Sequence, residues 1–158
     1  MGLIAELGVG SVALDTAIFI YFIEEDPQFL PEIVPLFREA DQGKRELVTS
    51  ALTLLEVLVV PYRAGHRLLA ERYEALLTRS RGIRLVDLSR DQLRAAAQLR
   101  AATGVKIPDA LQLVAAIGAG CTTFLTNGRR LPPVPGLRVM QLASSRQCRH
   151  SLDENLLD

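Results

Sequence analysis

The amino-acid sequence predicts a single α/β domain, a three-layer α/β/α sandwich in which helices cover both faces of a central parallel sheet. Short apolar runs typical of buried strands alternate with longer runs whose apolar residues recur at helical spacing. Such alternation favours parallel strands joined by right-handed helical crossovers. The chain has 158 residues, of which 49% are hydrophobic, so it can bury one sizeable core. No repeat or Gly/Ser-rich linker divides it, so we expect one domain over residues 1–143 and a polar, mobile tail over residues 144–158.

The candidate strands are short apolar runs bounded by residues that favour turns or begin helices. In chain order they span residues 11–14, 46–49, 83–88, 121–126 and 136–142. The run CTTFLT at 121–126 carries no charge, which is typical of a buried strand.

The candidate helices lie between these strands and have recognisable beginnings and ends. Thr16 is the expected N-cap of the first helix, and Ser50 and Ser89 are expected to cap two later ones. Pro61 falls where the third helix would continue, so we expect a kink or a break there. Gly104 is expected to end the fifth helix. In chain order the helices are predicted over residues 15–25, 31–42, 51–60, 66–79, 90–104 and 108–119.

Charge and cysteine content exclude several classes of protein. Lys plus Arg and Asp plus Glu both number 18, so the chain cannot hold nucleic acid by bulk positive charge and any basic contact must be local. Cys121 and Cys148 lie in unlike surroundings and are too few for a disulfide framework or a zinc site. No signal peptide and no apolar run long enough to cross a membrane is present, so we expect a cytoplasmic protein.

Three acidic residues stand in apolar surroundings where surface exposure does not explain them. Asp15 follows an apolar strand, Glu56 lies in ALTLLEVLVV, and Asp109 is the only charge in IPDALQLVAAIGAG. Partial burial of a carboxylate costs several kcal/mol unless a partner compensates. Asp15 alone is explained equally well as a helix cap, and Asp109 as a favourable charge at a helix N-terminus. Glu56 is in mid-helix and can be neither.

Topology favours a metal site for these three acids. Asp15 ends a parallel strand and Asp109 lies in the first turn of a helix, and the functional crevice of an open α/β sheet lies beyond the carboxyl ends of its strands. A cluster of carboxylates without thiols or imidazoles suits Mg²⁺, with Mn²⁺ as an alternative. Such a metal would bind phosphate oxygens and activate a water for phosphodiester cleavage.

Three segments carry the acids in an ordered pattern. VALDTAIFIYF contains Asp15, SALTLLEVLVVPYRAG contains Glu56, and TGVKIPDALQLVAAIGAGCTTFLTN contains Asp109. In this order and at these spacings they resemble the PIN-domain family over about residues 12–142, especially the toxin subunits of VapBC-type bacterial toxin–antitoxin pairs. The resemblance implies a Mg²⁺-dependent endoribonuclease, often a homodimer, held inactive by a cognate antitoxin protein. It makes Asp15 and Asp109 direct metal ligands and Glu56 a further ligand or the residue that orients the attacking water.

The sequence departs from the family pattern after the last of these segments. Many relatives have an acid where this chain has Gly128, so a four-acid site and a second metal are in doubt. Thr126 and Asn127 can still offer oxygens to a water or metal, and Thr16 adjoins Asp15. These three residues are our candidates for substrate contacts.

Arg129 and Arg130 follow directly, at the expected rim of the site. They could bind the RNA backbone despite the zero net charge. Two solvent-facing arginines after a turn explain them equally well.

Other functions remain open at this point. The rivals within the same fold are a PIN-like interaction module whose catalysis has decayed, and a housekeeping PIN nuclease in RNA maturation. A phosphoacceptor receiver domain would need paired acids after the first strand, and a haloacid-dehalogenase-like phosphatase would need an Asp in place of Ala17. A dinucleotide-binding module would need a glycine-rich turn after the first strand, whereas GVGS precedes it.

Overall fold

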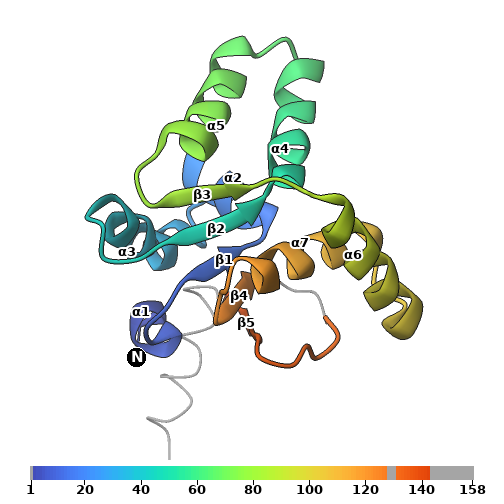
Figure 1. Ribbon diagram of the computed structural model, residues 1–158. Coiled ribbons are helices and arrows are strands. Elements are labelled where there is room, and N and C mark those ends of the chain that lie inside the picture. Colours follow the sequence, from blue (N-terminus) through green and yellow to red (C-terminus); the bar gives the residue numbers. More distant parts are fainter. Residues whose placement is uncertain (1, 128–130, 143–158) are drawn as a thin grey trace, which may run out of the picture.

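A computed structural model describes residues 2–127 and 131–142 of the chain. Its centre is a sheet of five parallel strands in the order β3-β2-β1-β4-β5 (Figure 1). The strands are β1 Val12–Leu14, β2 Leu47–Ser50, β3 Ile83–Val86, β4 Thr123–Thr126 and β5 Arg138–Gln141. Because all of them run the same way, their carboxyl ends meet at one edge of the sheet, here called the carboxyl edge, and their amino ends meet at the amino edge.

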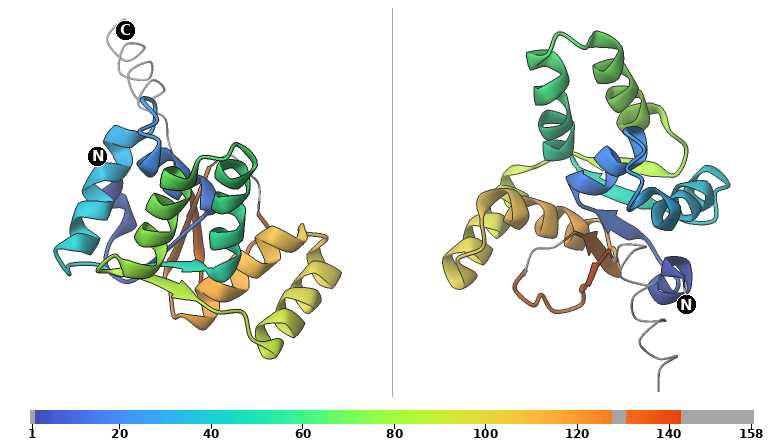
Figure 2. Two further views of the ribbon diagram at one scale, coloured as in Figure 1. Left: turned by 90° about the horizontal axis from the view of Figure 1, so that it is seen from above. Right: turned by 180° about the vertical axis from the view of Figure 1, so that it is seen from behind.

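Helices cover both faces of this sheet, as the sequence predicts. Their bounds are α1 Leu3–Leu7, α2 Thr16–Ile23, α3 Leu30–Asp41, α4 Ala51–Arg63, α5 Arg67–Arg79, α6 Arg90–Thr103 and α7 Ile107–Gly118. Figure 2 shows α4 and α5 packed side by side, and α6 and α7 paired in another part of the molecule. The predicted three-layer α/β/α sandwich is confirmed.

Alternation of side chains along the strands separates two cores. Val12 and Leu14 of β1 pack with residues of α1 to α5, whereas Ala13 between them packs with Leu113 and Ala116 of α7. Successive strand residues point to opposite faces of a sheet, so three residues of β1 serve both layers. The central strand is therefore buried on both sides and its end is held rigidly.

Several predicted caps and boundaries are confirmed. Ser89 and Gln92 form a reciprocal capping box at the start of α6, and Gly104 ends that helix in the left-handed conformation. Pro108 lies in the first turn of α7, where a proline has no hydrogen bond to lose. No helix in the described part of the chain is both long enough and apolar enough to span a membrane.

Other expectations were wrong. Asp15, not Thr16, caps α2, because its carboxylate accepts a hydrogen bond from the Thr16 amide. Helix α4 does not break at Pro61 but continues to Arg63, because Pro61 is buried within the last turn and this packing offsets the one hydrogen bond that a proline removes. The sequence reading also missed α1, which is only five residues long.

Candidate metal centre

The three acidic residues predicted to form the site line one pocket at the carboxyl edge. Asp15 follows β1, Glu56 comes from α4 and Asp109 from the first turn of α7. All three are half-buried, as predicted from their apolar surroundings. The pocket has a volume of about 380 Å³ and is lined by Asp15, Thr16, Ala17, Ile20, Glu56, Pro108, Asp109, Gln112 and Asn127. The structure thus brings together residues that lie far apart in the sequence.

Asp15 is held in place by two neutral donors. Its Oδ1 accepts from the Thr16 amide at 2.8 Å, and its Oδ2 accepts from the Thr126 hydroxyl at 2.8 Å. Within the described residues it forms no ion pair. The carboxylate is therefore fixed in orientation while its negative charge is not cancelled by a lysine or arginine of that part of the chain.

Glu56 is anchored to the same segment through a hydroxyl. Its Oε1 accepts a hydrogen bond from Thr16 Oγ1 at 3.0 Å. Thr16 is therefore shared, because its amide orients Asp15 and its side chain orients Glu56. Thr16 is itself 7% exposed, so it acts as a buried connection between the two carboxylates and also reaches the pocket wall.

A buried chain of hydrogen bonds supports the floor of the pocket. Gln112 Nε2 donates to Thr53 Oγ1 at 2.8 Å, and the hydroxyls of Thr53 and Thr49 are 2.7 Å apart. Thr49 donates to the Leu14 carbonyl at 3.0 Å, so the hydrogen between the two threonines belongs to Thr53. Each hydrogen bond of this chain therefore has one defined donor and one defined acceptor, which makes the pocket more rigid.

Gln112 and Thr53 are site residues that the sequence reading missed. Gln112 is 3% exposed and Thr53 is 0% exposed. A usable signal existed for the first: Gln112 is the only strongly polar residue of α7 after Asp109 and lies three residues later, on the same helix face. Thr53 offers no such signal, because a threonine near a helix start is ordinary.

The other predicted substrate contacts fall into two groups. Asn127 lines the pocket, and its side-chain amide donates to the Tyr21 hydroxyl, whose ring stacks on Phe29 at 4.5 Å. Thr126 is 1% exposed and contacts Asp15, which favours a role in orienting that carboxylate. The second group, Arg129 and Arg130, lies outside the described residues, as does Gly128.

The donor set fits a hard divalent cation that keeps part of its water shell. The pocket offers carboxylate, hydroxyl and amide oxygens and no thiol or imidazole. Within residues 2–127 and 131–142, no three acidic, histidine or cysteine side chains approach closely enough to enclose a metal ion by themselves. A divalent cation bound here would therefore need water molecules among its ligands.

Comparisons with known proteins support the fold. The model of the PIN domain family matches residues 12–137. No curated protein matches the sequence. The chain is similar to the VapBC2 complex of Rickettsia felis bound to a promoter DNA fragment, with 16% identity and a TM-score of 0.63 over 84% of this chain and 98% of the other.

Two further solved structures are similar. DNA-bound VapBC of Salmonella typhimurium has 22% identity and a TM-score of 0.58, over 85% of this chain and 100% of that one. VapC20 of Mycobacterium tuberculosis, described as a sarcin-ricin loop cleaving toxin, has 15% identity and a TM-score of 0.60, over 72% and 87%. At these identities the likeness concerns the fold alone.

Proposed function

Because this chain belongs to the PIN domain family, we propose that it is a metal-dependent endoribonuclease whose metal lies in the pocket of Asp15, Glu56 and Asp109. The observation that carries the proposal is the gathering of three carboxylates from β1, α4 and α7 at the carboxyl edge of a parallel sheet. Mg²⁺ is the expected metal and Mn²⁺ the expected substitute. The expected substrate is the RNA phosphodiester backbone.

Each residue has a distinct part in this proposal. Asp15 and Asp109 would hold the metal, and Thr126 and Thr16 keep the Asp15 carboxylate in one orientation. When bound, a divalent ion there would polarise a phosphate oxygen and lower the pKa of its bound water. Glu56, fixed by Thr16, would orient the attacking water. Asn127, held by Tyr21, would contact the substrate on the same pocket wall.

We also propose that the protein is the toxin of a toxin–antitoxin pair, with a cognate antitoxin protein as its partner, and that it acts in the cytoplasm as a homodimer. Support comes from two solved structures of similar fold, one described as a toxin–antitoxin complex and one as a member of the VapBC family of toxin–antitoxin systems. Our candidate for the partner surface is α4, because Leu55, Val60 and Tyr62 are each more than 60% exposed there. Such apolar exposure is typical of surfaces that another chain covers.

Metal-dependent cleavage of total bacterial RNA tests the nuclease proposal. Wild-type protein should cut RNA with Mg²⁺ or Mn²⁺ and not with EDTA. Asp15→Asn and Asp109→Asn should each lower the rate by about a hundredfold or more, because several kcal/mol of charge stabilisation depend on the metal. Asp91→Asn is the matched control, since Asp91 is exposed on α6 and pairs only with Arg94 in the described structure.

The outcomes separate this proposal from its rivals. Equal behaviour of wild type and both site variants in metal would favour the interaction module without catalysis. Cleavage without growth arrest on expression, and without a neighbouring frame for a small DNA-binding protein, would favour a housekeeping nuclease in RNA maturation.

A further inference from the structure

A second pocket opens beside the carboxylate pocket, and the roles assigned above leave it unused. Its volume is about 610 Å³, and Asp109 lines both pockets. Its other lining residues come from the loop between α6 and α7 and from the segment that precedes β5: Thr103, Gly104, Val105, Lys106, Leu131 and Pro132. Because the two pockets share a wall residue, one extended ligand can occupy both. We call this second site the Lys106 pocket.

The floor of the Lys106 pocket is fixed by hydrogen bonds. Gly104 takes a positive φ of 74°, which turns the chain out of α6. Arg100 donates from Nη1 to the Val105 carbonyl at 2.8 Å, and the Val105 amide donates to Thr103 Oγ1 at 3.3 Å. Val105 is 9% exposed, and Leu131 packs against the same small core. Because the backbone of this loop is hydrogen-bonded to the side chains of Arg100 and Thr103, we expect the surface it forms to exist before a ligand binds.

Lys106 places a positive charge on this surface. Its side chain is exposed, and its ammonium makes no hydrogen bond or ion pair within the part of the chain that the structure describes. Lys106 is also the N-cap of α7, where the helix dipole adds a partial positive charge. Asp109 is three residues away and half-buried, yet no ion pair joins the two residues.

Part of the pocket lining is apolar. Val105, Leu131 and Pro132 contribute hydrocarbon surface, whereas Lys106 contributes a cation. A nucleotide has the matching pair of features, a flat base face and an anionic phosphate. The volume also falls within the range usual for ligand sites, roughly 300–1,000 Å³.

We propose that the Lys106 pocket binds the nucleotide next to the cleaved phosphodiester bond, with the Lys106 ammonium pairing with its phosphate. This inference rests on the proposed function, because it places the cleaved bond in the carboxylate pocket. Asp109 then marks the crossing point of the RNA strand between the two pockets. Lys106 is a positioning residue for the strand and takes no part in bond cleavage.

Binding of single-stranded RNA without cleavage tests the inference. The probe is a fluorescein-labelled, mixed-sequence RNA of about twelve nucleotides, titrated in EDTA and followed by fluorescence anisotropy. Lys106→Ala should raise the Kd about fivefold and reduce the slope of log Kd against log salt by about 0.7, the change expected for one lost phosphate contact to a single strand. Lys106→Arg should restore both values. Because Lys106 is exposed, none of these variants should disturb folding.

The matched control is Lys44→Ala. Lys44 is the only other lysine of the sequence and is exposed in the loop that leads to the amino edge, away from both pockets. Its removal should leave the Kd and salt slope within about a tenth of a log unit of wild type. Equal effects of the two alanine variants would show attraction by overall charge and would overturn the inference.

Cleavage kinetics separate this inference from the proposed function. With Mg²⁺, Lys106→Ala should raise KM and leave kcat within about twofold, because binding is lost equally from ground and transition states. Unchanged Kd and KM alongside intact cleavage would refute the pocket and leave the nuclease standing. A Lys106-dependent Kd in a protein that cuts no RNA would refute the proposed nuclease and leave the Lys106 pocket as an RNA-binding site only.

Discussion

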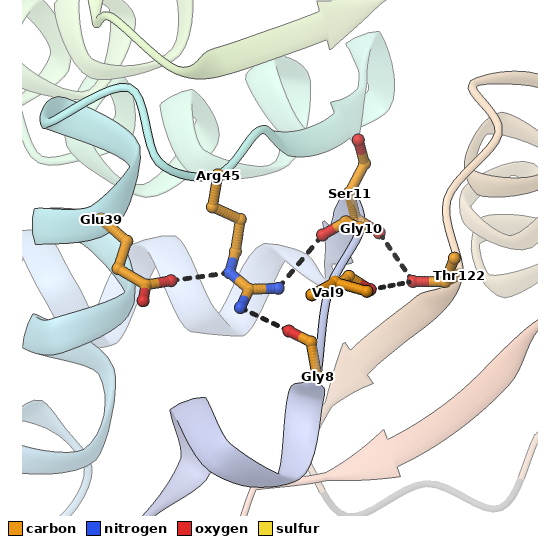
Figure 3. A network of polar contacts seen from close by, with 7 residues as sticks. All are labelled: Gly8, Val9, Gly10, Ser11, Glu39, Arg45 and Thr122. Atoms are coloured by element: carbon orange, nitrogen blue, oxygen red, sulfur yellow. Dashed lines mark hydrogen bonds and ion pairs between the residues drawn. The ribbon is translucent and has the colours of Figure 1, made fainter.

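The two edges of the sheet hold their charged groups in opposite ways. At the amino edge, Arg45 donates to Glu39 at 2.8 Å and to the carbonyls of Gly8 and Gly10 at 2.7 and 3.1 Å (Figure 3). Its side chain is 8% exposed, and its charge is neutralised by an acid and two carbonyl dipoles. At the carboxyl edge, Asp15 is similarly fixed, but its donors are an amide and a hydroxyl.

This difference separates a structural use of charge from a functional one. A buried charge that lies beside an opposite charge is neutralised by it, and the ion pair links the two segments that carry these residues. Holding a carboxylate with neutral donors fixes its geometry and leaves a net negative charge that a cation can satisfy. The arrangement at the amino edge therefore stabilises the fold, while the one at the carboxyl edge leaves an uncancelled charge, as the proposed metal site requires.

Removing Arg45 should have the largest effect on stability. Arg45→Ala removes the partner of a half-buried carboxylate and the donor to two exposed carbonyls, so we expect a loss of about 2 kcal/mol in the free energy of unfolding. Urea denaturation followed by circular dichroism measures it. Asp15→Asn should show the opposite pattern, with little loss of stability because Asn caps helices as well as Asp does.

Arg84→Ala is the control for this comparison. Arg84 and Glu46 form an ion pair at 3.5 Å with side chains 51% and 43% exposed, which should contribute at most about 1 kcal/mol. RNA cleavage by the folded Arg45→Ala protein should stay near the wild-type rate. A large fall in that rate without unfolding would mean that the two edges are coupled, contrary to the division described above.

Thr126→Val should have an intermediate effect, and it acts on the carboxyl edge only. The substitution keeps the shape of the side chain and removes the hydroxyl that donates to Asp15 Oδ2. We expect a roughly tenfold weaker response to metal, read as a higher Mg²⁺ concentration for half-maximal cleavage, since residues that orient ligands commonly contribute this much. Thr126→Ser should recover most of it. Equal metal response in the valine and wild-type proteins would remove Thr126 from the site.

The sequence indicated the candidate ligands of the proposed metal site more clearly than the residues that support them. Asp15 and Asp109 are recognisable because a strand end and a first helical turn are local features, and both meet at the carboxyl edge as parallel topology requires. The hydrogen bond between Thr53 and Gln112 could be found only in the structure, since it joins residues 59 positions apart. Lys106 lies only three residues before Asp109. Its proposed role in binding could not be inferred from the sequence, because the pocket also needs Leu131 and Pro132 from a distant segment.

The fold shows the same division between local and long-range information. The alternation of strands and helices follows from the spacing of apolar residues within short segments, so the sandwich could be predicted from the sequence. Continuation of α4 through Pro61 could not, because Pro61 is buried by packing that compensates for its missing hydrogen bond. The clamp of Arg45 on Gly8 and Gly10 is also long-range, joining residues 35 and 37 positions apart.

The smallest expected effect concerns Cys121, whose reactivity reports whether solvent reaches the amino edge of the sheet. The residue lies two positions before the start of β4 and is 5% exposed. Burial together with nearby Glu46 raises the pKa of its thiol to about 11. In a Cys148→Ser protein we expect slow reaction with a thiol reagent at pH 8 and fast reaction in urea, because the thiolate is the nucleophile. Since the folded thiol keeps its proton longer than the unfolded one, this group should favour folding below pH 9 and lose that contribution as pH rises toward 11. If the contacts of Arg45 keep solvent away from this edge, Arg45→Ala should speed the reaction of Cys121 in the folded protein. Equal rates with and without Arg45 would mean that Arg45 affects only the residues it contacts directly.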